Sequence, residues 1–104
     1  MQYQIVLVNL DLSIGSEMNK TRPCVIISPN EMNNHLQTIV IAPITNNSKN
    51  YPTRIPIKHR TTKRWIVIDQ PKTIDKKRVI KLFEQLSETE IATVKAVIKE
   101  TYVD

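Results

Sequence analysis

Apolar, β-branched residues occur along this chain only in short runs, and most runs end at Pro, Asn or Asp. The runs cover residues 5–8, 24–28, 37–42, 65–68 and 79–83. Short runs rich in Val and Ile are typical of strands, whereas helices need longer periodic stretches. The chain is therefore expected to fold mainly as a small sheet of short strands.

The only strong helix signal lies near the C-terminus. Ser87 and Glu90 form a capping box, in which each side chain bonds to the backbone N–H of the other residue. Apolar residues follow at helical spacing, at positions 91, 94, 97 and 98, and are expected to pack on the core. The patterns predict a mainly β fold with some α (α+β). We expect residues 1–104 to form one domain, a small, bent β-barrel of antiparallel strands with an amphipathic C-terminal helix.

Proline placement sets several expected boundaries. Pro43 is expected to end the strand at residues 37–42, because proline has no N–H for the ladder. Pro52 and Pro56 place a strand over residues 53–58 at the edge of the sheet.

Other segments carry weaker signals. Residues 30–36 have the composition of a loop or a single helical turn, and residues 59–63 form a basic turn. Residues 73–75 lead into a second basic turn. The two histidines, His35 and His59, are expected at the surface.

Positive charge is concentrated in the middle of the chain. The net charge is +5, and the only acids between residues 49 and 81 are Asp69 and Asp75. After Phe83 the balance becomes acidic. This asymmetry favours a surface that binds a polyanion, with an ordinary basic surface as the alternative.

Several classes of protein fit the sequence poorly. Cys24 is the only cysteine, so it cannot form an internal disulfide, and we expect a core residue in a cytoplasmic protein. No signal peptide and no membrane-spanning segment are expected. The spacing of the histidines does not suit a metal site. Because Gly15 is the only glycine, the chain cannot form a glycine-rich phosphate loop. No metal or cofactor is expected. A Ser-His-Asp hydrolase is not excluded by residue type, although the nucleophile elbow is missing.

Arg22 is the first candidate for chemistry. Pro23 fixes its own φ and disfavours helical backbone at Arg22, which therefore enters the next strand in an extended conformation. A guanidinium held in this way is suited to bind a phosphate, because its planar fork is oriented before the ligand arrives. The alternative is an ordinary solvated arginine.

Three further polar residues lie at or just after strand ends, namely Thr45, Asp69 and Gln70. Strand ends of a small barrel can converge on one rim. An arginine beside a threonine hydroxyl would then bind phosphate with one charged and one neutral donor. Gly15 is expected to mark a tight turn or a close approach of the backbone to a ligand.

Three blocks of the sequence resemble the MazF/PemK (Kid) toxins of type II toxin–antitoxin systems. The first block combines Val8-Asn9-Leu10-Asp11, Gly15-Ser16-Glu17 and Lys20-Thr21-Arg22-Pro23. The second is Ala42-Pro43-Ile44-Thr45, and the third is Asp69-Gln70-Pro71-Lys72-Thr73-Ile74-Asp75. Each block is short, but their order and spacing cover nearly the whole chain.

The resemblance implies an SH3-like, CcdB-like barrel that forms a homodimer. It also implies a sequence-specific endoribonuclease, an mRNA interferase, that cuts single-stranded RNA without a metal. Arg22 and Thr45 fall on the catalytic pair of the family. We assign a larger set to substrate binding: Gly15, Ser16, Glu17, Lys20, Thr21, Asn46, Asp69 and Gln70.

The chemistry that the family implies suits these side chains. The 2′-OH of RNA attacks the adjacent phosphate and gives a 2′,3′-cyclic phosphate and a 5′-OH end. Arg22 and Thr45 would stabilise the charge that builds up on the phosphate oxygens. Arginine is a poor base, so the base is either Glu17 or a phosphate of the substrate.

A partner is also implied. A MazE-like antitoxin with an acidic C-terminal tail would lie across the basic groove, and any binding to DNA would occur only through that antitoxin.

Two departures from the family pattern bear on the assigned roles. Some relatives have His where this chain has Ser16, and some have Arg where it has Val67, two residues before Asp69. A catalytic role for Asp69 is therefore open, and a structural carboxylate is the alternative.

Two other functions stay in view. A gyrase poison resembling CcdB would need neither Arg22 nor Thr45, and it would carry a Trp-Gly-Arg-Ile-like end where this chain has Thr101-Tyr102-Val103-Asp104. A non-catalytic RNA-binding barrel would bind RNA with a steep dependence on salt and make no cut.

Overall fold

The computed structural model describes residues 1–10, 21–47, 51–59 and 61–103. The strands are β1 (Gln4–Asn9), β2 (Thr21–Ile26), β3 (Thr38–Thr45), β4 (Arg54–His59), β5 (Thr62–Val67), β6 (Lys72–Asp75) and β7 (Val79–Gln85). The helices are α1 (Asn30–His35) and α2 (Glu88–Ile98), with a 3₁₀ turn at Lys76–Arg78 and a π-helical turn at Lys99–Val103.

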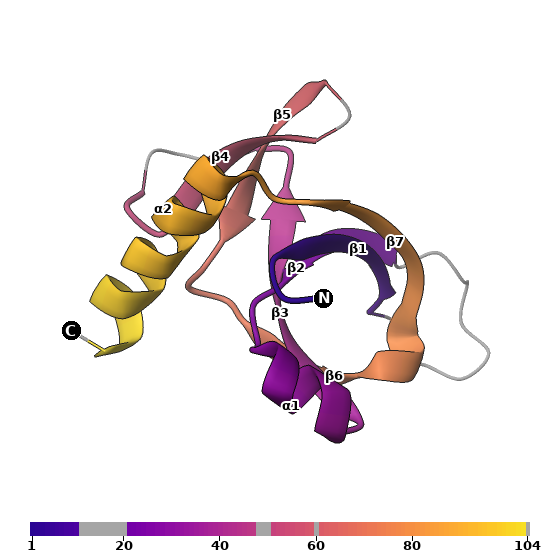
Figure 1. The fold of residues 1–104 in the computed structure, drawn as a ribbon. Helices are drawn as coiled ribbons and strands as arrows, with labels where there is room; N and C mark the ends of the chain where they lie inside the picture. Colours follow the sequence, from indigo (N-terminus) through magenta and orange to yellow (C-terminus); the bar gives the residue numbers. More distant parts are fainter. Residues whose placement is uncertain (11–20, 48–50, 60, 104) are drawn as a thin grey trace.

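The strands form one seven-stranded sheet in the order β4-β5-β3-β2-β1-β7, with β6 paired to β3. All pairs are antiparallel. The sheet curls into a half-barrel, and α2 lies across its β4 end (Figure 1). This arrangement confirms the predicted fold class, a mainly β protein with a C-terminal helix.

The apolar runs form the core as expected. Ile5, Val25 and Ile66 are among the buried residues of one cluster, against which α2 places Val94. A second buried cluster, which includes Cys24, fills the curve between β1, β2, β3 and β6. The predicted capping box begins α2: the Glu90 N–H donates to Ser87 Oγ at 3.1 Å, and the Ser87 N–H donates to Glu90 Oε1 at 2.9 Å.

The predicted end of the third strand at Pro43 is wrong. β3 continues through Pro43 to Thr45. Before Pro43 the strand pairs with β6, and after it the strand pairs with β5. A residue without an N–H is tolerated at this exchange of neighbours, because the ladder on this side of β3 is interrupted there, while on the other side Pro43 is in register with Cys24 of β2.

Two further boundaries differ from the sequence-based expectation. Residues 73–75, expected only to lead into a turn, belong to β6, which pairs with Thr38–Ile41 of β3. The predicted basic turn at residues 59–63 is shorter than expected, because β5 begins at Thr62. Thr61 turns the chain with a positive φ of 65°.

His59 was expected at the surface, and this expectation is wrong. It is only 2% exposed, and its Nδ1 lies 3.1 Å from Glu84 Oε2. Its ring also packs against Phe83, with the two centroids 5.1 Å apart. Because β4 and β7 are the two edge strands of the curled sheet, this contact joins its two ends. His35 is exposed, as expected.

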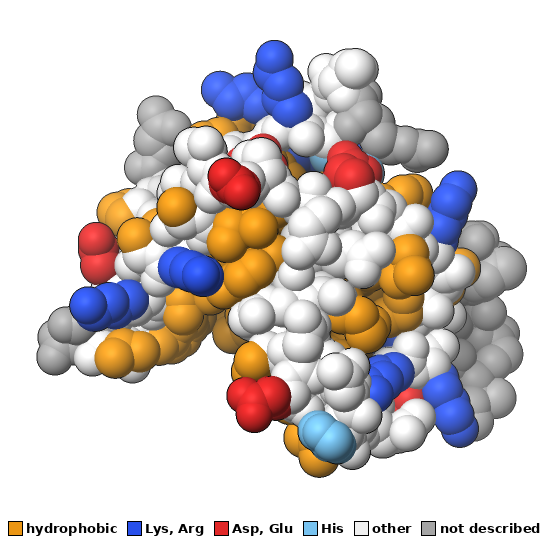
Figure 2. All heavy atoms as spheres, in the orientation of Figure 1, with side chains coloured by type: hydrophobic (Ala, Val, Ile, Leu, Met, Phe, Trp, Pro, Cys, Tyr) orange, Lys and Arg blue, Asp and Glu red, His pale blue; other side chains and the backbone are white. Residues whose placement is uncertain are grey.

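Charged and apolar side chains share the molecular surface. On the face shown in Figure 2, apolar patches lie between separated Lys and Arg side chains. Ile80 and Leu82, alternate residues of the edge strand β7, are 55% and 57% exposed. Among the described residues, no helix has the length and apolar character needed to cross a bilayer.

Candidate active site

A pocket of about 340 Å³ opens where β2, β3 and β5 meet. The described residues that line it are Thr21, Arg22, Pro23, Ile44, Thr45, Asn46, Asn47 and Arg64. The structure thus brings Arg22 and Thr45 together, with Thr21 and Asn46 beside them, although the two candidates lie far apart in the sequence. The lining contributes two guanidinium groups and no carboxylate among the residues that the structure describes.

Arg22 is the second residue of β2, and its backbone is paired with Val8 of β1. Pro23 follows within the same strand, so the extended backbone expected at Arg22 is present. The Cys24 thiol donates to the Arg22 carbonyl at 3.5 Å. Burial raises the pKa of Cys24 to about 12, against the lowering effect of Arg22 and Lys72. The thiol is therefore a packing group and not a nucleophile.

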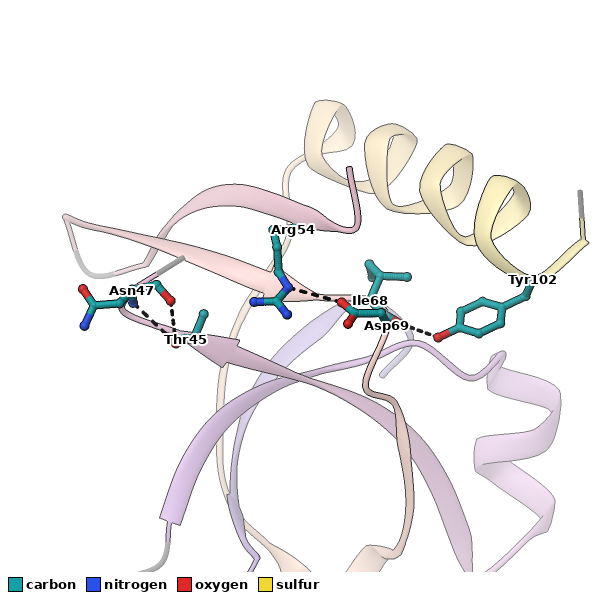
Figure 3. A network of polar contacts seen from close by, with 6 residues as sticks. All are labelled: Thr45, Asn47, Arg54, Ile68, Asp69 and Tyr102. Atoms are coloured by element: carbon teal, nitrogen blue, oxygen red, sulfur yellow. Dashed lines mark hydrogen bonds and ion pairs between the residues drawn. The ribbon is translucent and has the colours of Figure 1, made fainter. Parts of the chain in front are cut away.

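Thr45 is the last residue of β3, and its backbone is paired with Trp65 of β5. Its hydroxyl donates to the Asn47 carbonyl at 3.1 Å and accepts from the Asn47 N–H at 3.4 Å (Figure 3). This local turn holds the hydroxyl at the rim of the pocket. To donate to a ligand, the hydroxyl would rotate away from the Asn47 carbonyl.

Arg64 belongs to the pocket but not to the residues expected from the sequence. It lies in β5, between the predicted basic turn at residues 59–63 and the predicted strand at residues 65–68. Its Nε is buried and has no hydrogen-bond partner among the described residues. Only a prediction that β5 begins at Thr62, together with the register of β5 on β3, would place Arg64 beside Thr45.

Asp69 and Gln70 do not line this pocket. Asp69 Oδ1 lies 3.2 Å from Arg54 Nε, and the two side chains point toward each other in Figure 3. Arg54 also lies over the Tyr51 ring, with Cζ 5.3 Å from the centroid. Desolvation acts to raise the pKa of Asp69, but hydrogen bonds, above all from Arg54, outweigh it and lower that pKa.

The position of Arg54 bears on the departure at Val67. Arg54 faces Val67 directly across the β4–β5 ladder. The guanidinium that some relatives carry two residues before the Asp therefore reaches Asp69 here from the neighbouring strand. This geometry favours a structural ion pair at Asp69.

The C-terminal turn contributes one further contact beside this pair. The Tyr102 hydroxyl donates to the Ile68 carbonyl at 2.5 Å (Figure 3). Desolvation and the charge of Asp69 raise the pKa of this hydroxyl, so it stays protonated as a donor.

Four assigned residues, Gly15, Ser16, Glu17 and Lys20, lie outside the described part of the chain. Within the described part, no three His, Cys, Asp or Glu side chains lie together in a way that could hold a metal ion.

Comparison with known proteins places the chain in a family. Residues 1–102 match the family described as PemK-like, MazF-like toxin of type II toxin-antitoxin system. The chain belongs to the PemK/MazF family of toxins. The resemblance inferred from the three sequence blocks is thereby confirmed.

Individual relatives agree with this assignment. The chain is 32% identical over 96 residues to Endoribonuclease MazF of Staphylococcus epidermidis, which covers 86% of this chain and 80% of the relative. The fold of this PemK/MazF chain is similar to that of toxin MazF-mt6 of Mycobacterium tuberculosis, with a TM-score of 0.80, 18% identity and 96% of each chain covered.

A second similar fold is that of an endoribonuclease solved in complex with its cognate antitoxin, from a Mycobacterial species. The TM-score is 0.81 at 15% identity, over 96% of this chain and 91% of the other.

Proposed function

We propose that this toxin cuts single-stranded RNA at specific sequences, with Arg22 and Thr45 as its catalytic pair. The coarse class follows from the family and its curated relative: the chain is a MazF-like endoribonuclease toxin of a toxin–antitoxin system. The observation that supports the finer proposal is the shared pocket, where a guanidinium from β2 and a hydroxyl from β3 lie together without a neighbouring carboxylate among the described lining residues.

The proposed reaction is an internal transesterification. The 2′-oxygen of the ribose attacks the adjacent phosphorus, the bond to the 5′-oxygen breaks, and a 2′,3′-cyclic phosphate and a 5′-OH are released. Negative charge on the phosphate oxygens increases on the way to the transition state. The Arg22 guanidinium and the Thr45 hydroxyl would stabilise that charge, each by about 2–4 kcal/mol if they act like donors of an oxyanion hole.

Two proton transfers accompany this step: a base takes the proton of the 2′-OH, and the leaving 5′-oxygen gains a proton from the protonated base or from water. The described lining of the pocket holds no His, Asp or Glu that could take the proton from the 2′-OH. Our candidate for the base is Glu17, from the Gly15-Ser16-Glu17 block, or a phosphate of the substrate. The dependence on the 2′-OH would exclude DNA as a substrate. The cationic pocket supplies the positive charge that a metal ion would otherwise bring, so we propose cleavage without a metal.

The remaining substrate contacts are proposed from position. Thr21 and Asn46 line the pocket beside the catalytic pair and would contact the nucleotides on either side of the cut. Asp69 and Gln70 lie outside it and would act on RNA that extends beyond the pocket, Asp69 chiefly through its ion pair with Arg54.

An antitoxin and a second copy complete the proposed system. We propose a cytoplasmic homodimer that an antitoxin of the MazE type neutralises by laying an acidic tail over the cationic pocket. Two guanidinium groups without a paired carboxylate would attract such a tail as they attract RNA. DNA binding by the complex would then come from the antitoxin.

The test is cleavage of a long single-stranded RNA in EDTA by the purified toxin, followed by mapping of the product ends. We expect discrete cuts with 5′-OH ends, and Arg22→Ala should lower the cleavage rate by about 100-fold or more. Lys99→Ala, which removes the same charge on the C-terminal turn outside the pocket, serves as the control and should cut normally.

Three outcomes would contradict parts of the proposal. Binding of RNA without cuts would indicate a binding module, and cuts by a folded Arg22→Ala protein would refute the site. Cuts that require added Mg²⁺ would refute the metal-independent reaction.

A further inference from the structure

We propose that Arg64 is a second catalytic guanidinium, which binds the same phosphate as Arg22 and acts mainly in the transition state. This inference rests on the proposed ribonuclease function. It concerns a residue that lies outside the three sequence blocks that resemble the family.

The position of Arg64 in the sheet directs it toward the pocket. Arg64 faces Ile57 across the β4–β5 ladder, and Ile66 follows on the same side of β5. Both isoleucines are buried. The Arg64 side chain therefore starts from the core side of the sheet, and it contributes to the pocket that Arg22 and Thr45 also line.

The bonding state of Arg64 is unusual for an arginine. Its Nε is buried and has no hydrogen-bond partner among the described residues. Buried donors are normally paired, because a buried N–H without an acceptor loses its bonds to water and gains none in return. Arg54, on the next strand, has its Nε 3.2 Å from Asp69. An oxyanion in the pocket would give Arg64 the acceptor that Arg54 already has.

The charge of the pocket indicates which species binds best. Two guanidinium groups line it with the amides of Asn46 and Asn47, and no carboxylate is present among the described lining residues. A phosphodiester carries one negative charge, whereas a phosphorus under attack by the 2′-oxygen gathers a second. The second guanidinium therefore matches the transition state better than the bound substrate, and its loss should reduce kcat more than it raises KM.

The experiment measures kcat and KM on a short single-stranded RNA that contains one mapped cleavage site. Arg64→Gln should lower kcat by about 100-fold and change KM by less than about threefold. Arg64→Lys keeps the charge but loses the fork that can hold two oxygens, so kcat should fall by about tenfold. Affinity for the same oligonucleotide with a 2′-deoxy sugar at the cut should stay within about threefold in both variants.

Lys63→Gln is the matched control. Lys63 precedes Arg64 on β5, is exposed, and does not line the pocket. The substitution removes the same charge from nearly the same place, so it measures any long-range effect of that charge on RNA cleavage. Its kcat should stay within about twofold of wild type.

Four results would overturn the inference. The first is a folded Arg64→Gln protein with kcat within about threefold of wild type, and the second is a loss that appears in KM alone. The third is an equal loss of kcat in Lys63→Gln. If circular dichroism shows that Arg64→Gln does not fold, Arg64→Lys becomes the test. The fourth result is then a wild-type kcat in Arg64→Lys. A wild-type protein that cuts no RNA refutes the proposed function and this inference together, whereas cleavage retained in the Arg64 variants refutes only the inference.

Discussion

Removal of the Thr45 hydroxyl should separate its part in catalysis from its part in the fold. Thr45→Val keeps the shape of the side chain but loses both bonds to Asn47, at 3.1 and 3.4 Å. The turn lies at the surface, so the free energy of unfolding should fall by only about 0.5–1.5 kcal/mol. Loss of one donor to the phosphate oxygens should instead raise the activation barrier by about 3–4 kcal/mol, equivalent to a 10²–10³-fold lower kcat.

Two assays measure these quantities on the same sample: urea unfolding for stability, and single-turnover cleavage of a short RNA for the chemical step. Thr45→Ser restores the hydroxyl and should recover most of the rate. Thr93→Val removes a hydroxyl that bonds to the Thr89 carbonyl on α2, and it should leave the rate unchanged. A Thr45→Val protein that is as stable as expected but cuts within about threefold of wild type would refute the role assigned to this hydroxyl.

Two further substitutions test the structure around the site. Asp69→Asn should cost less than about 1 kcal/mol, because the ion pair with Arg54 is partly exposed. The pKa of Asp69 is lowered in the fold, so its contribution to the free energy of unfolding is present above about pH 4 and is lost as the pH falls through the folded pKa. Unfolding curves of wild type and Asp69→Asn that stay equally far apart at lower pH would contradict this. Ser28→Ala should cost about 2–4 kcal/mol, because it leaves the buried Asn33 amide oxygen and the Val40 N–H without their partner. A fall in the free energy of unfolding of less than about 0.5 kcal/mol would show that water replaces the hydroxyl.

Local sequence patterns were enough to predict the elements whose signals are self-contained. The capping box of Ser87 and Glu90 and the apolar stripe that includes Val94 predicted α2, because capping and helical periodicity depend on neighbours in the chain. The edge position of β4 also followed from its prolines.

Features that depend on pairing could not be predicted in this way. Pro43 was expected to end a strand, yet β3 passes through it because its neighbours change there. His59 is buried because β4 and β7 meet at Glu84, a contact between residues 25 positions apart. Arg64 was assigned to no predicted element, and only the early start of β5 reveals its place in the pocket. In each case the deciding partner lies on another strand.

The pairing of Arg54 with Val67 also has a consequence for how such toxins diverge. Arg54 contacts Asp69 and faces Val67 across one ladder, so we expect an arginine at position 67 to reach the same carboxylate. Arginines at both positions would set like charges directly opposite each other and destabilise the pair of strands. Substitutions at the two positions are therefore expected to covary among relatives. Each relative would keep one cation, either at position 54 or at position 67. A motif that scores each position separately would record Val67 as a lost residue, although the charge beside Asp69 is still present on the adjacent strand.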